Sequence, residues 1–219
     1  MPDSGDVREK LQFNLKSSPG ETYKRVVKLT FAKGASLDDP KIDLSGDDRS
    51  GLYQSLIDAR HAANDLLGEQ KLKEDWLAFL EAEAGRAKTA EQRAVYDPHR
   101  LSAYIDLGMP EKAVPMLEQT ERDFPDDYNP TARLAAAYKA MGDYDKALAA
   151  SDRAMKKVYG PRKLQVYRTR ADIFIAKKDT EAARKTIQEA IAYAKSLPVG
   201  QRSDRSIAAL EKKLTEITQ

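Results

Sequence analysis

The sequence has 219 residues, of which 33% are charged and only 7% are aromatic. Basic and acidic residues nearly balance at 37 and 35, whereas nucleic-acid-binding domains usually carry a clear basic excess, so we expect no nucleic acid partner. The absence of cysteine excludes disulfides, thiol chemistry and cysteine-ligated metals. No apolar run is long enough to span a membrane. The N-terminal residues form no apolar signal region, which fits a cytosolic protein or a mature or trimmed form.

The N-terminal segment, 1–48, fits two interpretations. Apolar residues occupy alternate positions at both ends of 11–31, which is typical of a β-hairpin. Against the hairpin, Ser18 and Glu21 have the spacing of a helix capping box. We favour two helices here. The polar, acidic stretch 35–48 follows as a linker.

The next segment, 49–94, is predicted to form a degenerate helix-pair repeat. Its first helix covers 50–67 and is ended by Gly68. The inner face of that helix is an apolar stripe at helical spacing, formed by Leu52, Leu56, Ala59, Ala63 and Leu66. The second helix runs to about residue 84, with an inner face formed by Leu72, Trp76, Phe79 and Leu80.

Two features predict how the chain enters the following segment. Thr89 and Gln92 form a capping box that opens a helix. The dipeptide Asp97-Pro98 then interrupts this helix, because proline in a helix interior removes a backbone hydrogen bond and clashes with the preceding turn. We expect a new helix to begin at Pro98, with Asp97 as its cap.

One pattern occurs three times in 95–197, in copies covering 95–127, 128–161 and 162–197. Each copy contains an aromatic residue, then a turn, then a small residue, with a spacing of roughly 34 to 36 residues between copies. The three sets are Tyr104, Gly108 and Ala113; Tyr138, Gly142 and Ala147; and Phe174, Asp179 and Ala183. The last segment, 198–219, is predicted to hold a capping helix over 203–218, which covers the end of such an array.

This pattern resembles the tetratricopeptide repeat. The resemblance implies an all-α fold of tandem antiparallel helix pairs, arranged as a right-handed superhelical array. Small residues in the second helices let the pairs pack closely; here they are Ala113, Ala147 and Ala183, and later Thr120, Ala154 and Ala190. Several positions depart from the family pattern: its early tryptophan is Asp97, Thr131 and Tyr167, its glycine after the first helix is Lys178 in the third copy, and Ser151 replaces a large apolar residue.

The same resemblance implies a binding site. In that family the first helices line a concave groove that holds peptide segments. The corresponding residues are Ser102, Asp106, Asn129, Arg133, Lys139, Gln165, Arg168 and Asp172. The Lys and Asn set with which some members grip a terminal carboxylate is not present. The sequence therefore predicts a non-catalytic scaffold that binds a protein or peptide, such as an acidic segment.

A closer resemblance is to the C-terminal helical region of bacterial proteins in which a thioredoxin-like domain precedes it. It is carried by 96–101, 123–130 and 159–164. Those relatives tend to be exported, so the resemblance implies a periplasmic location, whereas the composition leaves the cytoplasm equally open. This sequence has no Cys-x-x-Cys and no thioredoxin pattern. It represents either a stand-alone relative or a fragment, and an accessory role beside an envelope enzyme is an alternative function.

Other candidate sites are less favoured. His61 and His99 lack metal-binding spacing, and no glycine-rich phosphate loop occurs, so we expect no metal and no cofactor. The acidic pairs beside prolines are expected to be solvated turns rather than catalytic carboxylates. The stretch 153–170 holds seven basic residues and no acidic one. It is interpreted either as a solvated loop or as a surface that attracts an acidic segment. An RNA-binding repeat, with bases stacked on Tyr159 and Tyr167, is the third alternative.

Overall fold

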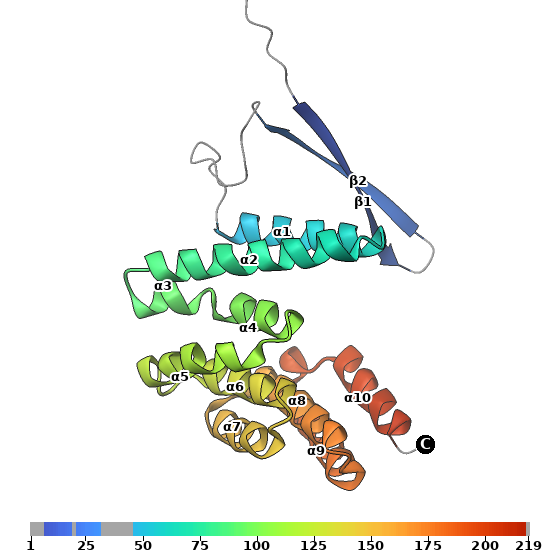
Figure 1. Cartoon of the computed structure of the whole chain (residues 1–219). Helices are drawn as coiled ribbons and strands as arrows, with labels where there is room; N and C mark the ends of the chain where they lie inside the picture. Colours follow the sequence, from blue (N-terminus) through green and yellow to red (C-terminus); the bar gives the residue numbers. More distant parts are fainter. Residues whose placement is uncertain (1–6, 19–20, 32–45, 218–219) are drawn as a thin grey trace, which may run out of the picture. The chain divides into compact units, whose positions relative to one another are not determined.

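The computed structural model describes residues 7–18, 21–31 and 46–217, with side chains from Ser50 onwards. It divides into two units, 1–76 and 77–219, whose boundary falls within helix α2. Figure 1 shows the elements of both units. Most of the predicted linker, 35–45, lies outside the described residues. Each unit is described by itself below.

The first unit begins with a β-hairpin, so our preference for two helices in this segment was wrong. Strands β1 (Val7–Ser18) and β2 (Glu21–Phe31) pair antiparallel, with Leu11 opposite Val27. The alternation of apolar residues in both segments has the period of a strand. This strand periodicity, rather than the spacing of a helix, matches the structure. Ser18 and Glu21, which were predicted to form a capping box, instead end β1 and begin β2.

Helix α1 (Gly46–Ala62) and the beginning of α2 (Leu66–Arg86) follow. The break between them is not at Gly68, as predicted, because Asn64 takes a left-handed conformation with φ of 56°. Asp65 then caps α2 by accepting a hydrogen bond from the Gly68 backbone N–H at 2.9 Å. An Asn and an Asp at a turn therefore ended one helix and started the next.

The predicted inner face of α1 is displaced as a consequence. Tyr53 and Ile57 are buried on α1, whereas Leu66, predicted to continue the stripe, is 64% exposed. In α2 the predicted inner residues Trp76, Phe79 and Leu80 are buried. The predicted linker residues 46–48 are the first turn of α1 rather than loop.

The second unit continues with α3 (Ala90–Ala94), which Thr89 caps as predicted by accepting from the Gln92 backbone N–H at 3.3 Å. The predicted restart at Asp97-Pro98 is confirmed, because α4 spans Asp97–Asp106. The prediction that Asp97 caps this helix was wrong. Tyr96 occupies the cap position without a side-chain hydrogen bond, and Asp97 is buried with 1% of its surface exposed.

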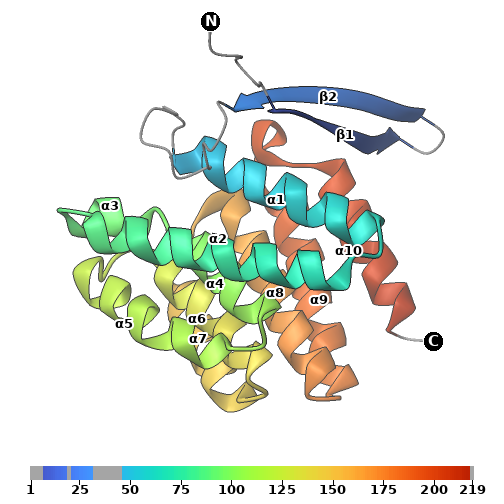
Figure 2. The same cartoon turned by 45° about the horizontal axis from the view of Figure 1, so that its top comes forward.

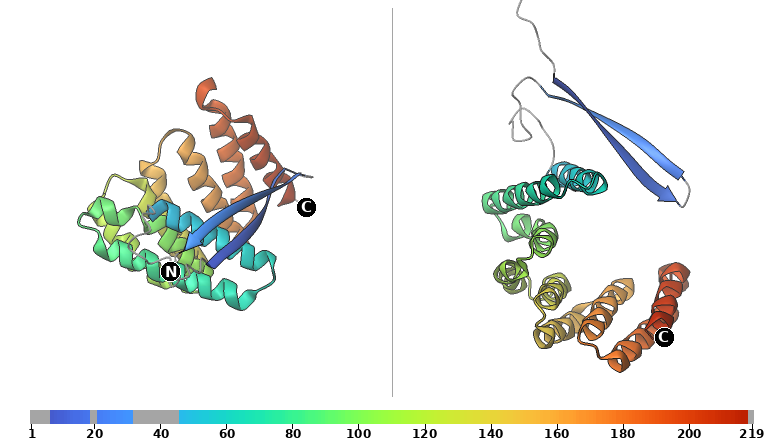
Figure 3. Two further views of the ribbon diagram at one scale, coloured as in Figure 1. Left: turned by 90° about the horizontal axis from the view of Figure 1, so that it is seen from above. Right: turned by 45° about the vertical axis from the view of Figure 1, so that its right-hand side comes forward.

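The remaining elements form the predicted pairs, which Figure 3 shows nearly end-on in its right-hand view. The first repeat is α4, the 3-10 turn η1 (Pro110–Lys112) and α5 (Ala113–Asp123). The second is α6 (Tyr128–Ala140) with α7 (Tyr144–Lys157). The third is η2 (Gly160–Arg162), α8 (Lys163–Ala176) and α9 (Thr180–Ser196). The predicted tandem helix pairs of 95–197 are thereby confirmed in the second unit.

The small residues of the second helices form the contacts expected of them. Ala113, Ala147 and Ala183 are fully buried at 0% exposure. The later small residues, Thr120, Ala154 and Ala190, are also buried, and Thr120 is 2% exposed. Because these side chains are short, the paired helices can approach closely, and larger residues such as Leu117 and Leu134 fill the space between pairs.

Left-handed residues end the first helices of all three repeats. Gly108 and Gly142 have φ of 71° and 78°, a region that glycine enters without a steric penalty. In the third repeat Lys178 takes the same conformation with φ of 63°. The turn geometry is thus kept even where the glycine is missing, at the cost of steric strain on a residue with a Cβ.

The predicted capping helix is α10 (Asp204–Glu216), preceded by the 3-10 turn η3 (Val199–Gln201). Ser203 caps it by accepting from the Ser206 backbone N–H at 3.2 Å. Ile207 and Leu210 are buried in one cluster with residues of α8 and α9, including Ile187. The apolar end of the third repeat is therefore covered. Among the described residues, none of the helices combines the length and the apolar character that a bilayer span requires.

Candidate binding face

The first helices of the three repeats lie side by side. Contacts join α4 to α6 and α6 to α8, and Figure 2 shows α6 and α8 as neighbours. Each first helix also packs against its own second helix. The eight residues predicted to bind a partner lie on α4, α6 and α8. Within the described part of the chain, no hydrogen bond or ion pair joins any of the eight to another.

In the first repeat, Ser102 and Asp106 are both exposed on α4. In the third repeat, Gln165 is exposed and Arg168 is half-buried on α8. Asp172 differs, because its carboxylate forms an ion pair with Lys213 of α10. Its charge is therefore balanced within the chain, so Asp172 contributes less to an external partner than predicted.

The second repeat places three predicted residues on α6. Asn129 donates from its side-chain amide to Asp127 at 2.8 Å, and Asp127 also caps the helix. Arg133 and Lys139 are half-buried. Burial lowers the pKa of Arg133, and the carboxylates of Asp97 and Asp127 oppose that shift. No ion pair to Arg133 or Lys139 occurs among the described residues.

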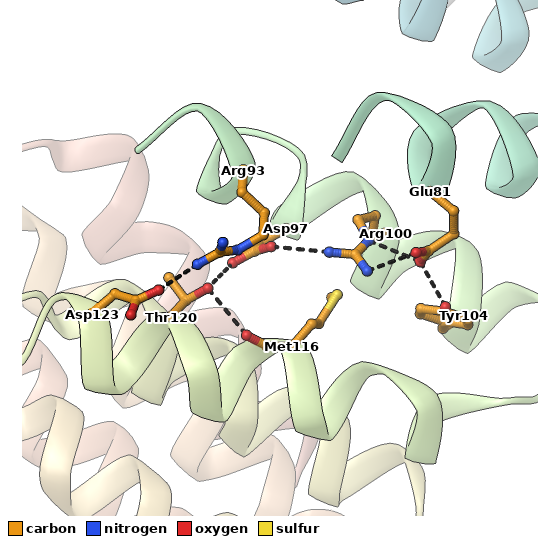
Figure 4. Close-up of polar contacts among 8 residues, drawn as sticks. All are labelled: Glu81, Arg93, Asp97, Arg100, Tyr104, Met116, Thr120 and Asp123. Carbon is orange, nitrogen blue, oxygen red and sulfur yellow. Dashed lines mark hydrogen bonds and ion pairs between the residues drawn. The ribbon is translucent and has the colours of Figure 1, made fainter. Parts of the chain in front are cut away.

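A polar cluster that the sequence did not predict lies inside the first repeat (Figure 4). Thr120 of α5 donates to Oδ2 of the buried Asp97 at 2.7 Å. The other oxygen, Oδ1, lies 3.6 Å from a guanidinium nitrogen of Arg100 and accepts no hydrogen bond. Thr120 also approaches the carbonyl oxygen of Met116 at 3.1 Å. Asp97 stands at the position where the family has a tryptophan, and it is held there by polar contacts rather than by apolar packing.

The cluster extends to α2 through a second carboxylate. Arg100 donates two hydrogen bonds to Glu81, each 2.8 Å long, and the Tyr104 hydroxyl donates to Glu81 at 2.6 Å. Arg93 and Asp123 form a further ion pair at its other end (Figure 4). These contacts tie the end of α2 to α3, α4 and α5, so we interpret the cluster as support for the repeat rather than as a reactive site.

Burial and charge shift the pKa values in this cluster in opposite directions. Burial raises the pKa of Asp97, although Thr120 and nearby arginines oppose the shift. Burial also acts to raise the pKa of Glu81, but the hydrogen bonds from Arg100 and Tyr104 prevail and lower it. Burial, together with the hydrogen bond to Glu81, raises the pKa of Tyr104 to about 12.

The basic stretch 153–170 is partly neutralised. Arg153 donates two hydrogen bonds to Glu121, at 2.8 and 3.0 Å, and Lys157 lies 3.9 Å from the same carboxylate. Arg170 forms an ion pair with Asp152. Internal contacts thus account for part of the run.

Both tyrosines of this stretch are placed by the structure. Tyr167 is half-buried and packs against Tyr193, with 6.1 Å between ring centroids. Tyr159 is 69% exposed, and the guanidinium of Arg162 lies 5.9 Å from its ring centroid. Only Tyr159 therefore presents its ring to a partner in the way that the RNA-binding interpretation requires of both.

A pocket that the sequence did not predict lies between the starts of α6 and α8. It is lined by Asp126, Asp127, Tyr128, Asn129, Lys157, Tyr159 and Arg162. Only Asn129 belongs to the predicted set. Tyr128 begins α6, Lys157 ends α7 and Arg162 ends η2, and the other lining residues lie in the connections between helices. Within the described residues, no group of three or more His, Asp or Glu side chains is arranged to hold a metal ion.

Comparison with known proteins places this fold. The model of the tetratricopeptide repeat matches residues 128–196, which contain α6 to α9. BtubC from P. vanneervenii is 16% identical, with a TM-score of 0.53 over 78% of this chain and 74% of that chain. A putative kinesin light chain from Podosopora anserina, with nearly identical TPR-like repeats, is 19% identical, with a TM-score of 0.52 over 80% of this chain and 88% of that chain. No curated protein matches.

These likenesses bear on fold alone, because both structures share less than a fifth of their residues with this chain. The family match and the helix pairs agree on the same segment, and the repeat phase predicted from Tyr138 and Ala147 lies within it. Residues 128–196 therefore match the tetratricopeptide repeat, and the helix pairs of the second unit have the fold of such repeats.

Proposed function

We propose that this protein is a non-catalytic scaffold that binds an acidic peptide segment of a protein partner on the face formed by α4, α6 and α8. The observation that carries this proposal is the charge left on that face. Lys139 and Arg168 have no ion-pair partner among the described residues, and the half-buried Arg133 lies near carboxylates without pairing with one. The carboxylate of Asp172 is balanced by Lys213.

The chemistry favours an acidic ligand. A half-buried guanidinium has lost part of its hydration, and a carboxylate that pairs with it restores the lost interactions. Lys139 and Arg168 raise the local potential and speed the encounter with an acidic segment. Asp106 of α4 is the one predicted acidic residue of this face that no internal cation neutralises among the described residues.

An array of peptides with systematically varied charge tests this proposal. We expect acidic peptides to be retained and their basic counterparts to be rejected, with binding that weakens as salt is raised. Lys139→Ala and Arg168→Ala should each weaken binding, whereas Lys185→Ala, an exposed lysine on the second helix α9, should leave it unchanged. Equal retention of acidic and basic peptides, or equal loss in all three variants, would contradict the proposal.

The accessory role beside a thioredoxin-like enzyme remains a prediction. It rests on the sequence runs given above, and a neighbouring or longer reading frame with a thioredoxin domain would support it. The RNA-binding alternative is less favoured because several basic residues of 153–170 are paired internally. A gel-shift assay with single-stranded RNA at low salt, giving a strong salt-dependent shift, would revive it.

A further inference from the structure

The pocket between the starts of α6 and α8 offers groups of both charges at one place. Lys157 and Arg162 supply cations, Asn129 supplies an amide, and Asp126 and Asp127 supply carboxylates. Asp127 already accepts from the backbone N–H of Asn129 at 2.9 Å. Asp126 is exposed, and neither a hydrogen bond nor an ion pair to it occurs within the described part of the chain. The pocket therefore combines two cations with one acceptor, Asp126, that internal contacts have not used.

The two cations of this pocket, Lys157 and Arg162, form only weak contacts within the chain. Lys157 is 3.9 Å from Glu121, but the same carboxylate already accepts both hydrogen bonds of Arg153. The Arg162 guanidinium lies over the Tyr159 ring and forms no ion pair in the described residues. An arginine held over an aromatic ring keeps its N–H groups free to donate. The cations are thus positioned and still able to bind.

The loop that carries Tyr159 is held in place from behind. The Tyr193 hydroxyl of α9 donates to the carbonyl oxygen of Gly160 at 3.2 Å. Gly160 itself has φ of 57°, a conformation that suits glycine. The ammonium of Lys163 lies 5.4 Å from the centroid of the Tyr193 ring. Because the loop is fixed before a ligand arrives, less conformational freedom is lost on binding.

We infer that this pocket docks one acidic residue of the partner's peptide, with the peptide backbone alongside Asp126. The inference rests on the proposed function and adds a second contact point, beyond the face of α4, α6 and α8. An acidic side chain would pair with Arg162 and Lys157, while Asp126 accepts a backbone N–H of the same peptide. The exposed Tyr159 ring would cover an apolar neighbour.

The mixed charge of the pocket selects a peptide over a nucleic acid. A peptide carries N–H donors along its backbone, so Asp126 and Asp127 have partners when an acidic side chain reaches the cations. The backbone of single-stranded DNA carries acceptors and negative charge only, and that of RNA adds only the 2′-hydroxyl as a donor, so the same carboxylates repel the phosphates. Of the two tyrosines that line the pocket, Tyr128 is half-buried, and the exposed ring of Tyr159 does not by itself provide a stacking platform for successive bases.

Amide chemical-shift mapping on the full chain tests this inference. The probes are capped octaglutamate, capped octaglutamine as the uncharged control, and an oligothymidylate of similar charge. We expect octaglutamate to shift the amides of 126–129, 157–160 and Arg162, and neither other probe to do so. Arg162→Ala should weaken the binding of octaglutamate by about tenfold, the typical effect of losing one charge-assisted contact.

Lys156→Ala is the matched control, because Lys156 is exposed, belongs to the same basic stretch and does not line the pocket. Its affinity for octaglutamate should equal that of the wild type. Shifts confined to α4, α6 and α8, lost in Arg168→Ala but retained in Arg162→Ala, would overturn the pocket and leave the proposed function standing. Shifts in the pocket alone, unaffected by Arg168→Ala and Lys139→Ala, would support the pocket and count against the proposed face. Equal shifts with oligothymidylate would overturn the choice of a peptide.

Discussion

Thr120 donates a 2.7 Å hydrogen bond to the buried carboxylate of Asp97, and the two residues occupy the early and late contact positions of one repeat. In the second repeat these positions are Thr131 and Ala154, and Thr131 instead donates to the carbonyl oxygen of Tyr128 at 2.8 Å. A threonine at the late position is thus matched to an acid at the early one. The hydrogen bond between them satisfies both the buried hydroxyl of Thr120 and one oxygen of the buried Asp97 carboxylate.

Removing the Thr120 hydroxyl should destabilise the protein more than removing an equivalent hydroxyl elsewhere. Thr120→Ala leaves the buried Asp97 without its hydrogen-bond donor, a loss of about 1–3 kcal/mol in the free energy of unfolding. Thr186→Ala is the control, because Thr186 is also buried on a second helix and donates only to the Ala182 carbonyl oxygen, at 2.8 Å. Urea denaturation measures both. Equal losses would show that the contact with Asp97 adds no stability.

The raised pKa of Asp97 predicts a pH-dependent difference between the wild type and Asp97→Asn. An acid whose folded-state pKa exceeds its unfolded value stabilises the fold fully at low pH, and this contribution is lost as pH rises through the folded-state pKa. The asparagine variant lacks this term. The free energy of unfolding of the wild type minus that of the variant should therefore fall as pH rises from about 4 to neutrality.

Denaturation in urea at a series of pH values checks this sign. The groups that face Asp97 are Thr120, Arg93, Arg100 and Arg133, and the arginines keep their charge throughout the range. The lowered pKa of Glu81 acts in the opposite sense in both proteins, because its contribution is lost as pH falls, so it cancels in the difference. A difference that rises with pH would mean that charge pairing outweighs burial at Asp97.

Tyr104 should titrate well above the ordinary pKa of a tyrosine. Its pKa of about 12 is caused by burial and by the hydrogen bond to Glu81. Comparing the alkaline ultraviolet titration of the wild type with that of Tyr104→Phe isolates this group. Glu81→Gln should lower the pKa of Tyr104 towards its ordinary value while leaving the part caused by burial. Circular dichroism at each pH confirms that the helices persist during the measurement.

Lys178→Gly should stabilise the protein. Lys178 has φ of 63°, where a residue with a Cβ is strained by roughly 1–2 kcal/mol, and the greater freedom of glycine in the unfolded chain offsets part of the gain. We expect a net increase of about 0.5–1 kcal/mol in the free energy of unfolding. Gly142→Ala is the reverse control: it should destabilise by strain alone, because no heavy atom lies within 4 Å of the added Cβ. Thermal melting compares them.

Ser151→Ala should also stabilise the protein. The Ser151 side chain is completely buried, and its hydroxyl has no hydrogen-bond partner. A buried, unsatisfied hydroxyl costs about 1–3 kcal/mol, and alanine removes it with little change in volume. Ser102→Ala, on an exposed helix surface, separates the effect of helix propensity and should gain only a few tenths of a kcal/mol. Equal gains in both variants would mean that burial of the hydroxyl is inconsequential.

The sequence by itself determined the repeats. The spacing of Tyr104, Tyr138 and Ala147 is set by the helical period and by which residues are short enough to let helices touch, so it can be read without coordinates. It also predicted the capping helix, whose need follows from the apolar end of the third repeat. These properties depend on local periodicity, which a single chain displays directly.

The tertiary structure alone decided the rest. Local patterns in 11–31 supported both helices and strands, and only pairing between the two segments distinguished them. Asp97 looked like a helix cap because its partner, Thr120, lies 23 positions further along the chain. The sequence also did not show which charged residues are paired within the chain. Asp172 forms its ion pair with Lys213 only because α10 packs against the third repeat. Contacts between distant residues depend on how elements pack, and periodicity does not encode them.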